Sequence, residues 1–410
     1  MAGVRFFAPD TDAFVDSVVR HSKEFEEVTG LSLDIQIIPS DQYFSNAIGA
    51  YLDGDDGADV FMSGPVLLWE HIGAGHVEPL DEYVSESTQG FDFDDFLPAL
   101  IHGNRWTGKF GDGLGTGPLW EIPVNWETYN LAYNPAVLDR AQVDLPKTWS
   151  EYFAVAAEIR DRTAGAVSGF AQRGVQVWHT MYTGYATQFW SCGGRDFDDR
   201  GKCAIAKPEG IAATEAFLAG LHNAGPPAWT TQRWYELAMD FAAGKYGLIV
   251  DSDHYVAFFE DDSKSIMKGK TGYALPPTGP GGVRRPNMWT WSLVMNARSR
   301  NKSEAWRFVE WASGKSFLLR SAFEGNMNPT RRSAWDDPGF RERTAGWGDF
   351  HSVAIDLIDN YSKVLVTPSA DYLRIADRWV AALLSSHKGE QSVEEAMRRA
   401  AIDIDEIVAS

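Results

Sequence analysis

Apolar and polar residues alternate with two different periods along the first part of the chain. Apolar positions recur every three or four residues through 11–29, which predicts a helix that ends at Gly30. They recur every second residue through 31–37, which predicts a strand, and short apolar runs at 4–8 and 58–62 predict two more strands. Strands separated by helices indicate a parallel α/β unit, because parallel neighbours need such crossovers.

Helix-start signals continue this pattern along the chain. Ser40 is suited to begin a helix through Tyr51, which completes the strand–helix alternation of the first unit. Three later segments have a helix-capping residue with Glu three positions after it, which predicts the start of a helix. They are 148–151, 301–304 and 392–395. The spacing predicts an α/β protein whose last element is a helix.

Length and charge narrow the possible functions. A chain of 410 residues is too long for one compact core and fits two lobes, or two to three domains. With 37 Lys and Arg against 57 Asp and Glu, the net charge of −20 argues against a nucleic-acid binder and against a protein that lies on anionic membrane. No apolar run approaches the roughly 20 residues that span a bilayer.

Cys192 and Cys203 flank a polar turn segment. Two readings remain open: a pair of buried free thiols, or a local disulfide across a hairpin, which we favour and which would place the protein in an oxidising compartment. Zinc would need more sulfur or histidine ligands nearby. The sequence starts without the basic and apolar regions of a secretory signal, so an exported protein would have had its signal removed.

No catalytic or cofactor motif is present, and we expect no cofactor and no metal. The histidines do not cluster at metal spacing, and the acidic positions around 53–64 and 196–207 do not complete a calcium loop. Aromatic residues are abundant instead, with 16 Trp, 14 Tyr and 23 Phe. Flat aromatic faces pack against the C–H faces of sugars while polar groups bind the hydroxyls, although any single Trp can equally be core.

Four separated segments resemble the carbohydrate-binding components of bacterial ABC importers, the extracellular solute-binding family 1 that includes maltose-binding protein. They lie within 57–83, 122–151, 241–247 and 276–311, and the closing segment 389–397 matches the last helix of the family. The order and spacing of these segments, rather than any one of them, carry the resemblance.

The resemblance implies two α/β lobes of the type II periplasmic-binding-protein fold, with a ligand cleft between lobes joined by a hinge of several chain crossings. By that analogy lobe 1 comprises 1–123 and 275–328, and lobe 2 comprises 124–274 and 329–410. It also implies hinge closure around the ligand and delivery to a membrane permease.

Candidate ligand-binding residues follow from the same resemblance. Glu127 matches a position that supplies a ligand-contacting carboxylate in maltose-binding protein. The alternative is that Glu127 is a solvent-facing or hinge carboxylate. In the turn at 251–255, about ten residues after Gly244, His254 or Tyr255 is expected to provide the aromatic platform, with Asp253 as a hydroxyl acceptor, unless these are ordinary turn residues.

Further candidates lie in three places along the chain, and each could instead have a purely structural role. Trp289 is expected to face the cleft, whereas Trp291 on the same strand face is expected in the core. Trp178 and Tyr182 share a helical face and are suited to stack on a ring. Arg331 either donates to the ligand or only pins the hinge.

The ligand class departs from maltodextrin, because Val66-Leu67 replace the acidic–basic pair that maltose-binding protein uses there. We therefore expect a monomeric, periplasmic or otherwise extracytoplasmic receptor, with no catalytic residue, that captures a small sugar, oligosaccharide or polyol for an ABC permease. The alternatives are an extracellular carbohydrate-active hydrolase with a Trp-lined cleft, and the same fold with a polyamine or metal-ion ligand.

Overall fold

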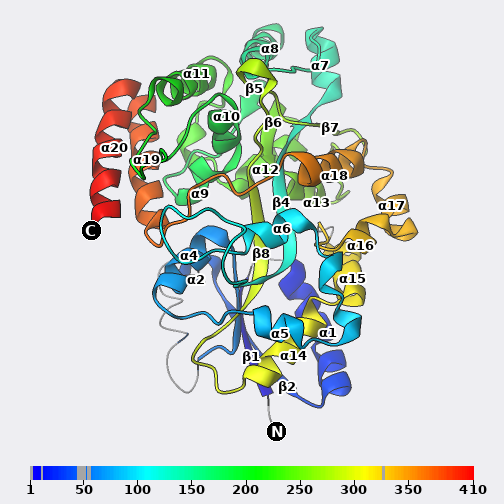
Figure 1. Cartoon of the computed structure of the whole chain (residues 1–410). Helices are drawn as coiled ribbons and strands as arrows, with labels where there is room; N and C mark the ends of the chain where they lie inside the picture. The colour runs from blue at the N-terminus through cyan, green and yellow to red at the C-terminus, as the bar shows by residue number, and fades with distance from the viewer. Residues whose placement is uncertain (1–2, 11–12, 44–51, 53–56, 326–327) are drawn as a thin grey trace. The chain divides into compact units, whose positions relative to one another are not determined.

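The computed structural model describes residues 3–10, 13–43, 52, 57–325 and 328–410 (Figure 1). Contacts divide the chain into two compact units. Unit 1 comprises Met1–Trp126, Trp289–Arg341 and Pro368–Tyr372, and unit 2 comprises Glu127–Met288, Glu342–Thr367 and Leu373–Ser410. The lobe boundaries inferred from the resemblance stay a prediction.

Unit 1 alternates strands and helices in its first part. Its elements are β1 (Gly3–Pro9), α1 (Ala13–Thr29), β2 (Ser32–Ile38), α2 (Ser40–Tyr43), β3 (Val60–Ser63), α4 (Pro65–Gly73), α5 (Asp81–Ser85), η1 (Gln89–Phe91), η2 (Phe93–Asp95), α6 (Pro98–Gly103), most of β8 (Met288–Met295), α14 (Lys302–Ala312), α15 (Lys315–Gly325), α16 (Arg332–Asp336) and the start of α17 (Pro338–Thr344).

The sheet of unit 1 has the order β2-β1-β3-β8. The strand β1 pairs in parallel with β2 and β3, and β8 returns antiparallel to β3. Helices α1, α14 and α15 pack together beside it, as their clustering in Figure 1 shows. Aromatic rings join these layers, with Phe308 lying 4.9 Å from Phe6 and 5.6 Å from Phe25 between ring centroids. This aromatic contact holds α1 and α14 against the sheet.

Unit 2 is richer in helix. Its elements are the second half of β4 (Ile122–Tyr133), α7 (Pro135–Ala141), α8 (Trp149–Arg162), β5 (Ser168–Ala171), α9 (Trp178–Thr180), a π-helical turn (Met181–Tyr185), α10 (Ala186–Ser191), α11 (Pro208–Ala224), η4 (Trp229–Thr231), α12 (Trp234–Ala242), β6 (Tyr246–Ser252), η5 (Asp253–Tyr255), α13 (Val256–Phe259), β7 (Gly272–Ala274), η6 (Pro280–Gly282), α18 (Phe350–Asn360), α19 (Tyr372–His387) and α20 (Val393–Ala409).

The sheet of unit 2 places β4 next to β6, β6 next to β5, and β7 on the other side of β4. The pair β4–β6 is antiparallel, whereas β5 and β6 run in parallel with Ala171 opposite Ile249. Helix α8 packs on β5 through Tyr152, whose ring centroid lies 5.4 Å from that of Phe170. Two parallel strands therefore end side by side at one edge of this sheet.

The predicted elements are largely confirmed. The strands expected at 4–8, 31–37 and 58–62 are β1, β2 and β3, and the expected helix at 11–29 is α1, of which 11–12 lies outside the described residues. Of the helix expected over 40–51, Ser40–Tyr43 is helical and 44–51 lies outside the described residues.

Two of the three capping patterns form complete capping boxes. At α8 and α20, the side chains of Thr148 and Ser392 accept from the backbone of Glu151 and Glu395, and the glutamates bond back. At α14 the helix begins directly after Asn301, as expected, but the Asn301 side chain makes no capping bond, and its amide nitrogen donates to Asp59 at 3.3 Å.

Within the described residues, no helix combines the length and the apolar character needed to cross a membrane.

Candidate functional site

The ends of β5 and β6 bring polar residues together in unit 2. Gln172 and Arg173 follow β5 directly, and Asp251 lies near the end of β6. Because Ala171 is opposite Ile249 in the parallel register, continuing both strands by two residues brings Arg173 beside Asp251. In α/β sheets, ligands commonly bind outside the carboxyl ends of the strands. This edge is therefore the candidate site.

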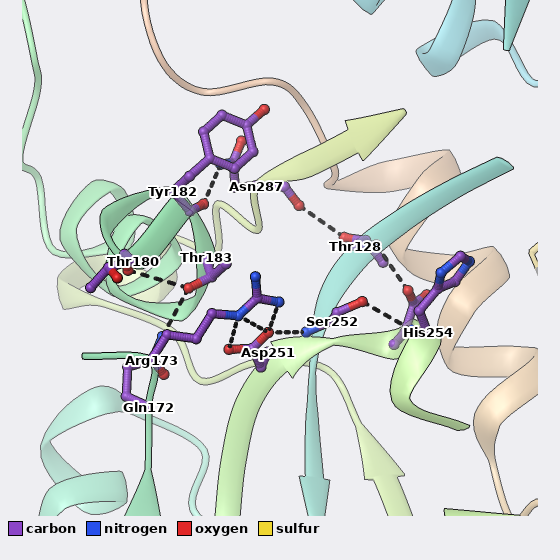
Figure 2. Close-up of polar contacts among 11 residues, drawn as sticks. Thr128, Gln172, Arg173, Thr180, Tyr182, Thr183, Asp251, Ser252, His254 and Asn287 are labelled. Carbon is purple, nitrogen blue, oxygen red and sulfur yellow. Dashed lines mark hydrogen bonds and ion pairs between the residues drawn. The ribbon is translucent and has the colours of Figure 1, made fainter. Parts of the chain in front are cut away.

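Arg173 and Asp251 form a buried ion pair at this edge. Arg173 Nε donates to both Asp251 oxygens at 3.1 and 3.2 Å, and Nη2 donates to Oδ1 at 2.5 Å (Figure 2). The two residues are 8% and 1% exposed. Burial lowers the pKa of Arg173, whereas the nearby Asp251 carboxylate raises it. The net shift of the pKa is upward, so the guanidinium stays charged. The side-on pairing occupies one edge of the guanidinium and leaves its Nη1 donors for another group.

Two buried polar atoms near this pair have no hydrogen-bond partner in the described part of the chain. They are His179 Nδ1 and Asn130 Nδ2. The Arg173 guanidinium carbon lies 5.8 Å from the Tyr255 ring centroid, and Asn130 is directly opposite Asp251 in the β4–β6 pair. Native proteins pair almost all of their buried polar groups, so such a group of atoms marks a place where a polar ligand or water completes the bonding.

The charge states of these groups suit a neutral partner. Burial, with a smaller contribution from Arg173, lowers the pKa of His179 to about 3, so this imidazole is uncharged at neutral pH. Burial also raises the pKa of Tyr255 well above its ordinary value, so its hydroxyl keeps its proton. The Arg173 and Asp251 charges compensate each other. The Arg173–Asp251 pair therefore offers hydrogen bonds without a net charge of its own.

A local break in helix geometry shapes the same region. The turn Met181–Tyr185 is π-helical, with Thr183 at φ −85° and ψ −131°. A Cβ atom at Gly184 would lie 1.9 Å from the carbonyl oxygen of Val250, so only glycine permits this approach to β6. Gln172 Nε2 donates to Thr183 Oγ1 at 3.2 Å. The turn is thereby held against β6 one residue before Asp251.

The predicted residues Trp178 and Tyr182 lie on this turn and the helix before it. Their rings meet edge to face with centroids 5.8 Å apart. The Tyr182 hydroxyl donates to the Met288 carbonyl at 2.7 Å, and Asn287 Nδ2 donates to the Tyr182 carbonyl at 2.6 Å. Tyr182 is buried and Trp178 is half-buried, so Trp178 presents the more accessible ring.

Glu127, Asp253 and His254 lie in unit 2 as well. Glu127 is half-buried, and its charge contributes to raising the pKa values of Tyr129 and Tyr255. Asp253 Oδ1 accepts from the Thr128 backbone at 3.0 Å. The His254 backbone donates to Ser252 Oγ at 3.2 Å, and burial lowers the pKa of His254 to about 4. Their ligand roles stay predictions.

Trp289 and Arg331 belong to unit 1. Trp289 is 2% exposed, meets Trp291 edge to face at 5.3 Å, and lies so close to Gly64 that a Cβ there would be 2.2 Å from its ring. Trp291 packs partly buried against the core of unit 1.

Arg331 is buried among the aromatic residues of unit 1. Its guanidinium carbon lies 3.9 Å from the Phe96 ring centroid, and it donates to the carbonyls of Ser313 and Asp92 at 2.9 and 2.8 Å. Burial lowers the pKa of Arg331 to about 10. These contacts describe a residue that fastens the backbone of unit 1, and its contact with a ligand stays a prediction.

The expected disulfide is wrong, because Cys192 and Cys203 are both free thiols. The hairpin register places Cys203 opposite Phe197, whereas Cys192 ends α10 before the turn begins and its sulfur accepts from Gln188 Nε2 at 3.7 Å. Burial raises the pKa of the two thiols to about 11 and about 12, so both stay protonated. The inference of an oxidising compartment therefore loses this support.

Sequence reasoning missed Arg173, Asn130 and His179, and gave Asp251 no role. Arg173 and Asp251 could have been found from their positions, because each lies at or near the end of a strand and the two strands are separated in sequence by a long helical segment. Among the described residues, no group of three or more His, Cys, Asp or Glu side chains is placed to hold a metal ion.

Comparison with known proteins identifies the family. The model of the bacterial extracellular solute-binding protein family matches residues 10–316. An erythritol/L-threitol-binding protein of Mycolicibacterium smegmatis is 30% identical over 379 residues, covering 90% of this chain and 79% of that protein.

Solved structures give the same fold. An ABC transporter solute-binding protein from Agrobacterium radiobacter in complex with ribitol superposes with a TM-score of 0.86 at 19% identity, covering 99% of this chain and 98% of that one. One from Agrobacterium vitis with bound D-mannitol gives a TM-score of 0.82 at 20% identity, covering 100% and 99%. The α/β, two-lobe fold expected from the sequence is confirmed, and the chain belongs to the bacterial extracellular solute-binding protein family.

Proposed function

We propose that this chain is the ligand-binding component of an ABC importer and that its ligand is an acyclic polyol. The observation that carries the proposal is the buried, charge-compensated pair Arg173–Asp251 with partnerless polar atoms around it. The similarity to proteins named for erythritol and L-threitol, ribitol and D-mannitol supports the choice of polyols, since all of these compounds are open-chain sugar alcohols.

A polyol matches the chemistry of this edge. Each hydroxyl both donates and accepts a hydrogen bond, so a chain of hydroxyls can satisfy donors on Arg173 and Asn130 and the hydroxyl of Tyr255 together. A sugar acid would bring a negative charge to an arginine that Asp251 already neutralises. The half-buried ring of Trp178 offers an apolar face to the C–H groups of the same ligand.

We further propose that the ligand is bound and released unchanged, by a monomer outside the cytoplasm that hands it to the permease. The family supports this export and transport role. A hydrolase would need an acid and a base carboxylate flanking the scissile bond, and no observation on the described residues favours that alternative.

The proposal is tested by isothermal titration calorimetry of the protein against erythritol, L-threitol, ribitol, D-mannitol and maltose. We expect at least one polyol to bind and, at about 100 times its Kd, to stabilise the fold by about 2.7 kcal/mol in thermal unfolding. Proton NMR of the recovered polyol should show the starting compound. Binding of maltose alone, or conversion of the polyol to a product, would contradict the proposal.

A further inference from the structure

Asn287 is a fully buried residue at which separate segments of unit 2 meet. Its Nδ2 donates to the Tyr182 carbonyl at 2.6 Å (Figure 2), and its Oδ1 accepts from the Leu365 backbone at 3.0 Å. One partner is a backbone acceptor and the other a backbone donor, so the orientation of the amide is fixed. Asn287 therefore joins the π-helical turn to the segment that follows α18.

The backbone of Asn287 is held by two threonine side chains. Its N–H donates to Thr187 Oγ1 at 3.2 Å, and its carbonyl accepts from Thr128 Oγ1 at 3.0 Å. Because the Thr128 hydroxyl uses its single proton in this bond, the Ser362 hydroxyl, 2.6 Å away, is the donor in the contact between these two side chains. Asn287 is thus fixed through its backbone, and its amide reaches the π-helical turn from a firm support.

Tyr182 is bonded to the same segment at both of its ends. Its carbonyl accepts from Asn287, and its hydroxyl donates to the Met288 carbonyl at 2.7 Å. The turn that carries Tyr182 departs from helical geometry at the next residue, Thr183. Because a π-helical turn is irregular, bonds from outside it help to decide where it lies.

The same turn reaches the candidate site on its other side. Thr183 Oγ1 accepts from Gln172 Nε2 at 3.2 Å, and Gln172 directly precedes Arg173. The ring of Trp178 meets that of Tyr182 edge to face at 5.8 Å. A displacement of Tyr182 would therefore disturb both the end of β5 and the aromatic ring proposed to face the ligand.

We propose that Asn287 is a positioning residue for polyol binding. Its amide holds the π-helical turn in the place where Trp178 and the end of β5 can receive the ligand, and it acts through Tyr182 rather than by touching the ligand. This inference rests on the proposed function and deepens it. Every contact that carries it lies within unit 2.

The first test is Asn287→Asp, which keeps the size of the side chain. An ionised aspartate has no donor for the Tyr182 carbonyl, whereas a protonated one offers an O–H in place of the lost N–H. Burial raises the pKa of a carboxyl, so we expect this group to be ionised at pH 9 and protonated at pH 5. Calorimetry with ribitol and erythritol should show binding about 10- to 100-fold weaker than in the wild-type protein at pH 9, and recovery toward the wild-type Kd at pH 5.

Two further variants serve as controls. Asn287→Leu removes both side-chain bonds at every pH, so its weaker binding should not recover at pH 5. Ser362→Ala removes a bond of the same network without touching Tyr182, so its urea midpoint should fall while its Kd stays unchanged. The wild-type affinity should be nearly constant from pH 5 to 9, because burial lowers the pKa of His179 to about 3 and that of His254 to about 4.

The outcomes separate this inference from the proposed function. If the wild-type protein binds a polyol and N287L binds it equally tightly, the inference is overturned and the proposed function stands. An equal loss of affinity in S362A would show that general loosening of the network weakens binding, and would overturn it too. Binding of neither polyol by the wild-type protein removes both claims. Should N287L not fold, the pH profile of N287D decides, and a profile without recovery at pH 5 overturns the inference.

Discussion

Arg173 holds Asp251 side-on, with Nε 3.1 Å and Nη2 2.5 Å from the same carboxylate oxygen. Asp251 Oδ1 also accepts from the Ser252 backbone at 2.7 Å. The pair thus joins the residue that follows β5 to the end of β6, so the position of the guanidinium depends on the fold of unit 2 as a whole.

The first prediction concerns this pair. Asp251→Asn leaves a buried guanidinium without its counter-charge, and arginine cannot shed its proton. We expect the free energy of unfolding to fall by about 3–5 kcal/mol, measured by urea unfolding. Asp161→Asn is the matched control, because the Arg160–Asp161 pair is exposed by 39% and 66% and exposed pairs contribute at most about 1 kcal/mol. Equal effects of the two variants would contradict the importance of the buried pair.

The second prediction concerns Tyr255. Tyr255→Phe removes a buried hydroxyl whose pKa is raised by burial and by its contact with the Asp251 carboxylate. Polyol affinity should fall by about 0.5–1.5 kcal/mol in calorimetry, because the ligand loses a hydrogen bond to this hydroxyl.

Tyr185→Phe provides the control for Tyr255. The Tyr185 hydroxyl lies 2.8 Å from Thr214 Oγ1 inside unit 2, so its removal should cost about 1 kcal/mol of stability and leave the affinity intact. If Y255F binds the polyol as tightly as Y185F does, the Tyr255 hydroxyl does not contact the ligand.

Stability should depend on pH through buried histidines. Burial lowers the pKa of His71 from 6.5 to about 4, with a further contribution from His76. Between these values the unfolded chain binds the proton and the folded chain does not, so stability present above pH 6.5 is lost as the pH falls toward 4. Each such histidine contributes a slope of about 1.4 kcal/mol per pH unit.

The variant His71→Gln isolates this contribution. Urea unfolding across that pH window should show a shallower loss of stability than in the wild-type protein, by about the slope of one histidine. Parallel curves for the two proteins would mean that His71 titrates equally in the folded and unfolded states.

The fourth prediction concerns the cysteines. Because both thiols are free and burial raises their pKa values to about 11 and about 12, little thiolate exists at pH 8 and alkylation of the native protein should be slow. Alkylation after denaturation without reductant should add two groups by mass spectrometry. If the denatured protein is not alkylated and its mass is two hydrogens below that of the reduced chain, the two cysteines form a disulfide after all.

Local sequence signals predicted the elements well. Thr148 with Glu151, and Ser392 with Glu395, form their capping boxes because both partners lie within one turn. At Asn301 the expected helix also begins, but the side chain makes no capping bond, and its amide nitrogen donates to Asp59, which is distant in sequence. Closeness in sequence was a poor guide for Cys192 and Cys203, because the hairpin places Phe197 opposite Cys203.

The site was predictable only in part. Tyr255 was expected from the family resemblance and lies beside Arg173, whereas the ring of Trp178, also expected, meets that of Tyr182. Arg173 and Asn130 were missed because their meaning depends on strand pairing with Asp251, across sequence separations that no local pattern encodes. Unsatisfied atoms such as His179 Nδ1 are visible only once the surrounding chain has been placed.

The compensated charges of Arg173 and Asp251 have a consequence for the conditions in which the receptor works. Although the chain carries a net charge of −20, the two charges of the buried Arg173–Asp251 pair sum to zero, and a sugar alcohol has no charge to be screened. Binding of the proposed ligand should therefore be as tight in dilute as in saline solution.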